Sequence, residues 1–250
     1  MIKKLLLVPD TQVKPGVPLD HLEALGYIIV EERPDVIVHI GDHWDMPSLS
    51  SYDRGSAKAE GRRVLEDIAA GNNAMHVLLA PLRRLQESQR NNRKRVYSPE
   101  MYFLMGNHEN RIKRYENSHP ELQGFADDQL DLTDWTVVPF LEVLSLEGVD
   151  FSHYFYNPNS GKPFGGSMEY RLSKVKRSFV QGHEQGLKYA QEAVGDRRIH
   201  GLMAGAFYLH DEEYKGPQGN NHWRGYCWLH NIQDGDYDLQ TVGIQSLTEQ

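Results

Sequence analysis

Five apolar runs of strand length in this chain each end at a cluster of polar residues, and this feature limits the possible folds more than any other. The clusters are PDTQ at 9–12, GDHWD at 41–45, GNHEN at 106–110, SH at 152–153 and GHEQ at 182–185. Stretches of helical pattern separate the earlier runs, as is typical of a layered sheet with helices on its faces. Loops at the carboxyl ends of strands converge in space and commonly bind ligands. The sequence therefore predicts an α/β fold with a polar site at one edge of the sheet.

The spacing of apolar residues predicts the individual elements. Strands are expected at 5–8, 35–40 and 101–105, and further strands near 141–146, 149–153, 179–181 and 237–244. Apolar residues recur at helical spacing from 20 to 32 and again from about 57 to 90, where an interruption is expected near Gly71. The sequence QDGD at 233–236 is typical of a hairpin turn.

Composition limits the class of protein. A chain of 250 residues with 39% hydrophobic content can build one α/β core, so residues 1–250 are expected to form a single domain. The formal net charge of -8 argues against a protein that coats nucleic acid through a basic face. Cys227 is the single cysteine and cannot form an internal disulfide, and no apolar run approaches the roughly 20 residues of a membrane-spanning helix. We expect a soluble cytoplasmic protein without a membrane partner, and the sequence predicts no oligomeric state.

The polar clusters contain side chains that bind divalent metal ions. Asp, Asn, Gln and His supply the oxygen and imidazole donors that such ions prefer. Each residue alone has a structural explanation: Asp10 could cap a turn, Asn107 could adopt a left-handed backbone conformation, and His153 could be a hydrogen-bonded core histidine. Five such clusters in succession, each after a strand, favour a shared metal site over five separate structural roles.

These motifs resemble, in order and spacing, the signature of the calcineurin-like metallophosphoesterases. The resemblance covers about residues 5–185, and GNHE is its most specific part. It implies a four-layer α/β/β/α sandwich with two mixed β-sheets and a metal site at the carboxyl ends of strands. Residues 186–250 lie outside the motifs and are expected to complete the second sheet and to supply loops that face the substrate.

The resemblance also implies two divalent metal ions and assigns their ligands. The first ion would be bound by Asp10, Gln12, Asp42 and Gln185, and the second by Asp42, Asn107, His153 and His183. In this family the carboxylate that corresponds to Asp42 bridges both ions.

The first metal site departs from the family pattern. The family usually has DxH and GHxH, whereas this chain has Gln12 and Gln185 at the two histidine positions. An amide oxygen is a harder and weaker ligand than imidazole, so Mn²⁺ is the favoured ion, with Mg²⁺, Ni²⁺ and Zn²⁺ as alternatives. The first site is expected to bind its ion weakly, and a variant with a single metal ion or a decayed site is the alternative.

Hydrolysis of a phosphate ester by attack of a metal-bound hydroxide is the reaction that the resemblance implies. In this family His108 would act as the general acid, oriented by Asp45. Met46 occupies the position of an arginine found in many related protein phosphatases, so Arg111 is our candidate for binding phosphate, with a solvated helix charge as the alternative. His43 and His222 are further candidates for contact with substrate.

Three segments bear on the choice of ester. They are the basic run at 90–95, the aromatic stretch HYFYN at 153–157 and the segment NNHWRGY at 220–226. Aromatic side chains that stack on bases, with arginines on phosphates, favour a phosphodiesterase or nuclease that acts on nucleic acid or a nucleotide. The alternatives are a phosphomonoesterase acting on a phosphoprotein or a small metabolite, and a catalytically impaired binding protein that retains the fold.

Overall fold

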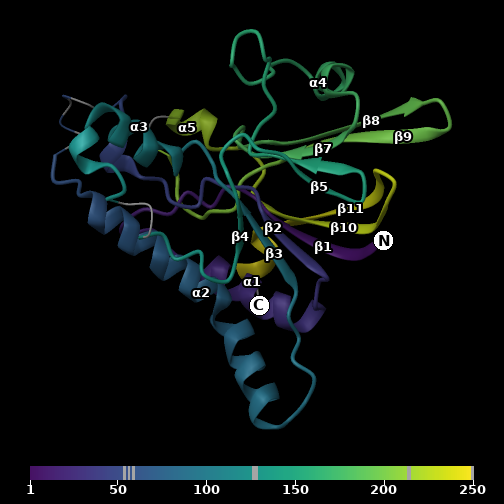
Figure 1. Ribbon diagram of the computed structural model, residues 1–250, viewed down its shortest axis with the longest axis horizontal. Helices are drawn as coiled ribbons and strands as arrows, with labels where there is room; N and C mark the ends of the chain where they lie inside the picture. Colours follow the sequence, from purple (N-terminus) through teal and green to yellow (C-terminus); the bar gives the residue numbers. More distant parts are fainter. Residues whose placement is uncertain (53–54, 56, 58–59, 126–128, 213–214, 249–250) are drawn as a thin grey trace.

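Two stacked β-sheets with helices on their outer faces form the core of the computed structural model, which describes residues 1–52, 55, 57, 60–125, 129–212 and 215–248 (Figure 1). The first sheet has the strand order β11-β10-β1-β2-β3-β4. Its strands are β1 (Ile2–Val8), β2 (Val36–His39), β3 (Glu100–Leu104), β4 (Thr136–Val138), β10 (Gly225–Gln233) and β11 (Asp236–Gly243). The first four strands are parallel, whereas β10 and β11 are antiparallel to their neighbours.

The second sheet is also mixed and has the order β5-β6-β7-β9-β8. Its strands are β5 (Leu144–Leu146), β6 (Val149–Phe151), β7 (Ser178–Gln181), β8 (Leu187–Val194) and β9 (Arg197–Ala204). Strands β6, β7 and β9 are parallel, and the two edge strands β5 and β8 are antiparallel.

Helices cover the outer face of each sheet and complete four layers. The helices α1 (Asp20–Glu32) and α2 (Val64–Asn91) lie below the first sheet in Figure 1, and α4 (Met168–Val175) lies above the second. The remaining helical segments are η1 (Pro47–Leu49), α3 (Asn110–Ser118), η3 (Pro120–Leu122), α5 (Gly216–Gly219) and α6 (Gln245–Thr248). The predicted fold class, with two mixed sheets and flanking helices, is confirmed.

Strand β1 shows how the sequence produces these layers. Its side chains alternate between faces, so Leu6 and Val8 pack against the helices while Leu5 and Leu7 pack between the two sheets. A strand buried on both faces reads as a continuous apolar run, which explains why it could be recognised from the sequence. A third, smaller core forms between the second sheet and α4 around Leu172 and Phe179.

The structure corrects two expectations about the elements. Helix α2 runs without interruption through Gly71. Position 71 requires glycine because a Cβ there would lie only 1.9 Å from the Trp44 ring. The glycine therefore admits the indole against the helix and does not break it. The helix begins at Val64 and not near residue 57, and positions 58 and 59 lie outside the described residues.

The last part of the chain divides between the two sheets. Strands β8 and β9 lie in the second sheet, whereas β10 and β11 join the first sheet beside β1. Positions 213–214 and 249–250 lie outside the described residues. The predicted hairpin turn at 233–236 is confirmed, since Gln233 pairs with Asp236 across the residues Asp234 and Gly235, which both have positive φ. Within the described residues, no helix is sufficiently long and apolar to cross a membrane.

Candidate metal centre

The five polar clusters follow strands whose carboxyl ends face one region of the molecule. The clusters that contain Asp10, Asp42 and Asn107 follow β1, β2 and β3, which are parallel in the first sheet. The clusters that contain His153 and His183 follow β6 and β7, which are parallel in the second sheet. The stacking of the two sheets brings both sets of loops to the same edge.

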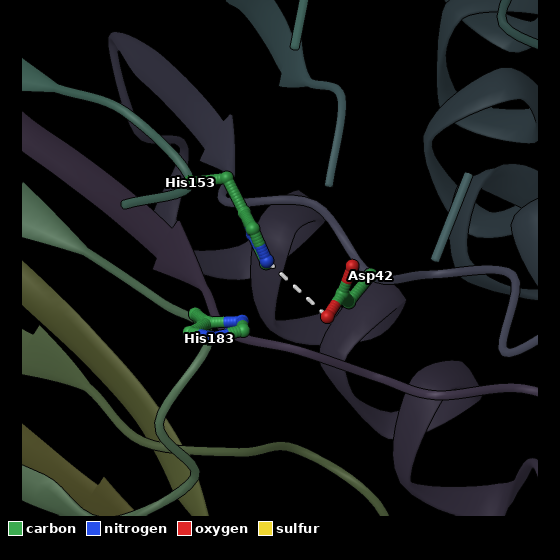
Figure 2. Close-up of side chains that lie close together, drawn as sticks. All are labelled: Asp42, His153 and His183. Carbon is green, nitrogen blue, oxygen red and sulfur yellow. Dashed lines mark ion pairs between the residues drawn. The ribbon is translucent and has the colours of Figure 1, made fainter. Parts of the chain in front are cut away.

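Asp42, Asn107, His153 and His183 lie around one point. Ligand atoms of Asp42, His153 and His183 all lie within 4.8 Å of one another, and Figure 2 shows the three side chains pointing toward one another. His153 Nε2 lies 3.2 Å from Asp42 Oδ2 and 2.9 Å from Asn107 Oδ1, and His183 Nδ1 lies 2.6 Å from the same amide oxygen. We call these four residues the histidine side of the candidate centre.

His153 is oriented by the main chain. Its Nδ1 donates to the carbonyl oxygen of Ile40 at 2.8 Å, which directs Nε2 toward Asp42. Burial favours the neutral ring, but the nearby charges of Asp42 and Asp10 outweigh it and raise the pKa of His153 to about 9. In the metal-free protein a proton therefore supplies the positive charge that the buried carboxylates require. A divalent cation at this point would replace that proton, so the donor set fits a metal ion.

Asp10, Gln12 and Gln185 form a second group, which we call the amide side. Gln12 Oε1 is buried and has no hydrogen-bond partner among the described residues. An unsatisfied buried acceptor costs about 1–3 kcal/mol, and a cation beside this oxygen would satisfy it. Gln185 differs, because its Oε1 accepts a hydrogen bond from the Tyr208 hydroxyl at 2.8 Å. The donors of the amide side fit a cation bound through oxygen.

Asp10 is a completely buried carboxylate next to the backbone of His183. Its Oδ2 accepts a hydrogen bond from the backbone N–H of His183 at 3.1 Å. Complete burial raises the pKa of Asp10 to about 8, the positive charges of His153 and His108 oppose this rise, and Asp42 adds to it. Glycine is required at 182, because a Cβ there would lie 2.4 Å from Asp10 Oδ1. The backbone thus leaves room for a buried carboxylate whose ionised form needs a cation.

His108, Asp45 and Arg111 lie together beside Asp42. His108 Nδ1 donates to Asp45 Oδ1 at 2.7 Å, and its backbone N–H donates to Asp42 Oδ1 at 2.8 Å. Although burial opposes it, the two carboxylates raise the pKa of His108 above its usual value. Arg111 donates from NH1 to the Asp45 carbonyl oxygen at 2.7 Å, and its NH2 lies 3.2 Å from His108 Nε2. Because a guanidinium can only donate, Nε2 of His108 accepts from Arg111 in this arrangement, and the ring can become an imidazolium only when that contact is given up.

Lys14 and Glu212 were not identified from the sequence. Lys14 Nζ lies 3.6 Å from Asp45 Oδ2 and donates to both carboxylate oxygens of Glu212 at 2.8 Å. Lys14 lies two residues beyond Gln12 in the same loop, so its position was a usable signal. Glu212 lies outside the recognised motifs and comes from a part of the chain that is distant in sequence.

Glu109 fixes the loop that carries Asp42. Its carboxylate accepts hydrogen bonds from the backbone N–H groups of Asp42, His43, Trp44 and Gly106 at 2.6 to 3.0 Å. The GNHE and GDHWD loops are therefore joined by one buried side chain.

Two predicted substrate contacts have different surroundings. His43 is completely buried, and its ring nitrogens lie 2.7 Å from Thr11 Oγ1 and 3.0 Å from the Gly71 carbonyl oxygen. A ring enclosed in this way cannot touch substrate, so we withdraw His43 from that role. His222 is partly exposed, and its Nε2 lies 3.1 Å from the hydroxyl of Tyr208, the residue that contacts Gln185. His222 thus lies at the border of the amide side.

Comparisons with known proteins agree with this arrangement of motifs. A family model described as calcineurin-like phosphoesterase matches residues 3–202. The chain is 32% identical over 128 residues to the gene 54 protein of Mycobacterium phage D29, a match that covers 51% of this chain and 44% of that protein. The chain thus spans less than half the length of this relative.

Two solved structures are also similar. Yfce, a phosphoesterase from E. coli, is 14% identical with a TM-score of 0.44, and the match covers 96% of this chain and 99% of that one. A dimetal phosphatase from Danio rerio is 12% identical with a TM-score of 0.46, and the match covers 97% of this chain and 96% of that one.

Proposed function

This chain belongs to the calcineurin-like phosphoesterase family, and from that premise we propose that it is a divalent-metal-dependent phosphodiesterase or nuclease acting on nucleic acid or a nucleotide. One observation carries the proposal. The ligand atoms of Asp42, His153 and His183 approach within 4.8 Å of one another, and the His108–Asp45 pair lies beside them. A cation site next to a proton donor is the arrangement that phosphate ester hydrolysis requires.

Two groups of residues would hold the metal ions. We assign one ion to Asp42, Asn107, His153 and His183, and a second to Asp10, Gln12, Asp42 and Gln185. Bound ions would neutralise phosphate oxygens and supply a water of lowered pKa. The oxygen donors of the amide side favour Mn²⁺ or Mg²⁺ there, whereas the imidazoles of the histidine side also suit Zn²⁺ and Ni²⁺.

His108 is the proposed proton donor to the leaving oxygen. The hydrogen bond to Asp45 holds its Nδ1, so Nε2 is the nitrogen that would face the leaving oxygen once Arg111, which lies 3.2 Å from it, turns to the phosphate. The raised pKa keeps the ring protonated to higher pH, as a general acid requires. Arg111 lies against Nε2 and is the proposed phosphate-binding cation, with Lys14 on the other side of Asp45.

An aromatic hollow beside the metal ligands favours a diester with a nucleobase. The Tyr154 ring centroid lies 4.8 Å from that of His183. Tyr154 also lines a hollow of about 290 Å³ together with Phe155, Tyr156, Phe164 and Lys174. Aromatic rings at the edge of a phosphate site can stack on bases, and base stacking is worth about 1–3 kcal/mol per base.

The test is hydrolysis of bis-p-nitrophenyl phosphate against p-nitrophenyl phosphate, with Mn²⁺, Mg²⁺, Zn²⁺ or Ni²⁺ added to protein freed of metal. We expect faster hydrolysis of the diester and the highest rate with Mn²⁺. Faster hydrolysis of the monoester would favour the alternative of a phosphomonoesterase.

The second alternative, a binding protein that retains the fold, predicts no turnover of any ester with any of the four ions. The matched control for this test is the His108→Asn variant, assayed on a diester with an alkyl leaving group as well as on bis-p-nitrophenyl phosphate. We expect it to retain the metal ions and to lose turnover of diesters with poor leaving groups.

We also propose that the chain forms a single domain and acts in a reducing compartment such as the cytoplasm. Strand β1 from the start of the chain pairs with β10 from its last part, which joins both ends of the sequence in one sheet. The one cysteine, Cys227, is buried and free.

A further inference from the structure

Thr11 lies between two residues assigned to the amide side and is enclosed by two histidines. Its side chain is buried, with Oγ1 at 2.7 Å from His43 Nδ1 and 3.3 Å from His39 Nε2. The two imidazole rings meet edge to face, with centroids 5.3 Å apart. Neither histidine is one of the proposed metal ligands, so the proposed reaction does not account for this cluster.

The hydrogen-bond partners fix the direction of every bond in the cluster. Gly41 N–H donates to His39 Nδ1 at 3.2 Å, so Nε2 of that neutral ring carries the proton and donates to Thr11. His43 Nε2 faces the Gly71 carbonyl oxygen at 3.0 Å and must donate, so its Nδ1 accepts from the Thr11 hydroxyl. One chain of hydrogen bonds thus runs from Gly41 through both rings to helix α2, and Thr11 is its central member.

Both rings are neutral in this arrangement, as the chain of donors and acceptors demands. A protonated ring would have an N–H donor at the nitrogen that must accept in this hydrogen-bond chain. Protonation of either histidine would therefore break one of its hydrogen bonds.

The loops joined by this chain contain strained backbone. Gln12 has φ 41° and Asp42 has φ 50°, a left-handed region that non-glycine residues seldom occupy. The two residues are connected directly, since Gln12 N–H donates to the Asp42 carbonyl oxygen at 2.9 Å. Such strain persists only where the surroundings enforce it and is common at functional sites. Glu109 holds the Asp42 loop through its N–H groups, and backbone hydrogen bonds from Val13 N–H to the His43 carbonyl oxygen at 2.7 Å and from Asp45 N–H to the Val13 carbonyl oxygen at 2.9 Å tie the two loops together. The Thr11 hydroxyl adds a side-chain link between the same two loops.

We propose that Thr11 is a positioning residue: by joining two neutral histidines, its hydroxyl holds Gln12 and Asp42 in the left-handed conformations that direct their oxygens toward the metal ions. Thr11 does not touch the ions or the substrate in this proposal. It acts through the two loops that carry the ligands.

The test compares Thr11→Val, which removes the hydroxyl at nearly the same volume, with Thr11→Ser, which keeps it. We expect Thr11→Val to weaken Mn²⁺ binding, measured by titration calorimetry, by about 10- to 100-fold, as for other groups that orient metal ligands. Thr11→Ser should stay within a few-fold of the wild type. Ser178→Ala is the matched control, because Ser178 is also buried and its Oγ accepts a hydrogen bond from His200 N–H. Ser178 begins β7, at the end of the strand opposite to the His183 loop. It should lower thermal stability without weakening Mn²⁺ binding.

A second measurement uses the unmodified, metal-free protein and does not depend on folding of the variants. Ring ¹⁵N shifts should show the Nε2–H tautomer for both His39 and His43. An Nδ1–H tautomer or an imidazolium at either ring would overturn the proposal, as would wild-type Mn²⁺ affinity in Thr11→Val. This inference rests on the proposed metal centre, and the two can fail separately: a wild-type protein that binds no Mn²⁺ contradicts the proposed function, whereas the tautomers test the hydrogen-bond chain alone.

Discussion

The histidine side and the amide side of the proposed centre share Asp42 but differ in how their donors are prepared. On the histidine side, the ring nitrogens and the carboxylate already approach one another, and His153 is oriented by the Ile40 carbonyl oxygen. On the amide side, Gln12 Oε1 is unsatisfied among the described residues, and the Gln185 oxygen is held by Tyr208. One side is assembled before an ion binds, whereas the other needs the ion to become satisfied.

The two halves of a two-metal site can therefore change independently. The amide side retains a buried carboxylate at Asp10, so it keeps the charge that attracts a cation. It lacks imidazole nitrogens, so it loses the donors that bind Zn²⁺ and Cu²⁺ well. We therefore expect tight binding on the histidine side and weaker, oxygen-based binding on the amide side.

The largest effect should come from removing a donor of the histidine side. His153→Ala takes away a ligand and its hydrogen bond to Asn107, and we expect kcat/KM on bis-p-nitrophenyl phosphate to fall by about 10³-fold, or roughly 4 kcal/mol. Gln12→Ala is the matched change on the amide side and should cost about tenfold or less. Equal losses in the two variants, measured at saturating Mn²⁺, would break the comparison.

The next effect concerns His108, which lies against the shared Asp42. His108→Asn should lower kcat by about 10²-fold on a diester with an alkyl leaving group, because the departing alkoxide needs a proton. The loss should be much smaller with p-nitrophenolate, which departs without one. Steady-state rates on the two diesters give the ratio. A uniform loss on both would assign His108 to binding of the phosphate and not to proton transfer.

A smaller effect is expected from restoring imidazoles to the amide side. The double variant Gln12→His, Gln185→His should bind Zn²⁺ more tightly by about tenfold, or ~1.4 kcal/mol, because imidazole is the softer donor. Its Mn²⁺ affinity should change less. Competition titrations with both ions measure this. An unchanged Zn²⁺ affinity would mean that these two positions do not face an ion and that the comparison rests on the wrong residues.

The sequence was sufficient where burial and motif order act together. Strands buried on both faces, such as β1 and β2, appear as continuous apolar runs, and their ends located the five polar clusters. Strand β8 was not predicted, because it is an edge strand with mostly exposed side chains and carries polar residues such as Lys188 and Glu192. An edge strand needs apolar residues on one face only, so its pattern is weak.

Within the site, the sequence could not give the direction of a side chain. His43 stands inside GDHWD, yet its ring turns away from the metal centre toward Thr11 and Gly71. The contact between Lys14 and Glu212 joins residues far apart in sequence, and no local pattern marks it. Both outcomes depend on the packing of loops against helix α2 and the last part of the chain, which appears only in three dimensions.

The smallest expected effect is on thermal stability, and it separates the two sides by pH. Asp10 ionises near pH 4 in the unfolded chain but has a pKa of about 8 in the folded, metal-free protein, so between these values folding retains a proton and stability falls as pH rises. His153 has a pKa of about 9 in the folded protein and of about 6.5 in the unfolded chain, so its contribution is complete below pH 6.5 and is lost as pH rises toward 9.

Metal-free protein should therefore lose thermal stability, measured as Tm, between pH 5 and pH 9. Asp10→Asn carries no ionisable side chain at position 10, so it should remove the decline below about pH 6.5. A smaller decline above pH 6.5 should remain, because Asp42 still raises the pKa of His153 but the charge of Asp10 no longer adds to it. Added Mn²⁺ should stabilise the wild type more at pH 8 than at pH 6, because ions bind to deprotonated ligands. Scanning calorimetry of both proteins with and without Mn²⁺ measures each term. If Asp10→Asn shows the same decline as the wild type from pH 5 to 6.5, the buried carboxylate of the amide side is not the group that ionises. The proposed electrostatic difference between the two sides would then be wrong.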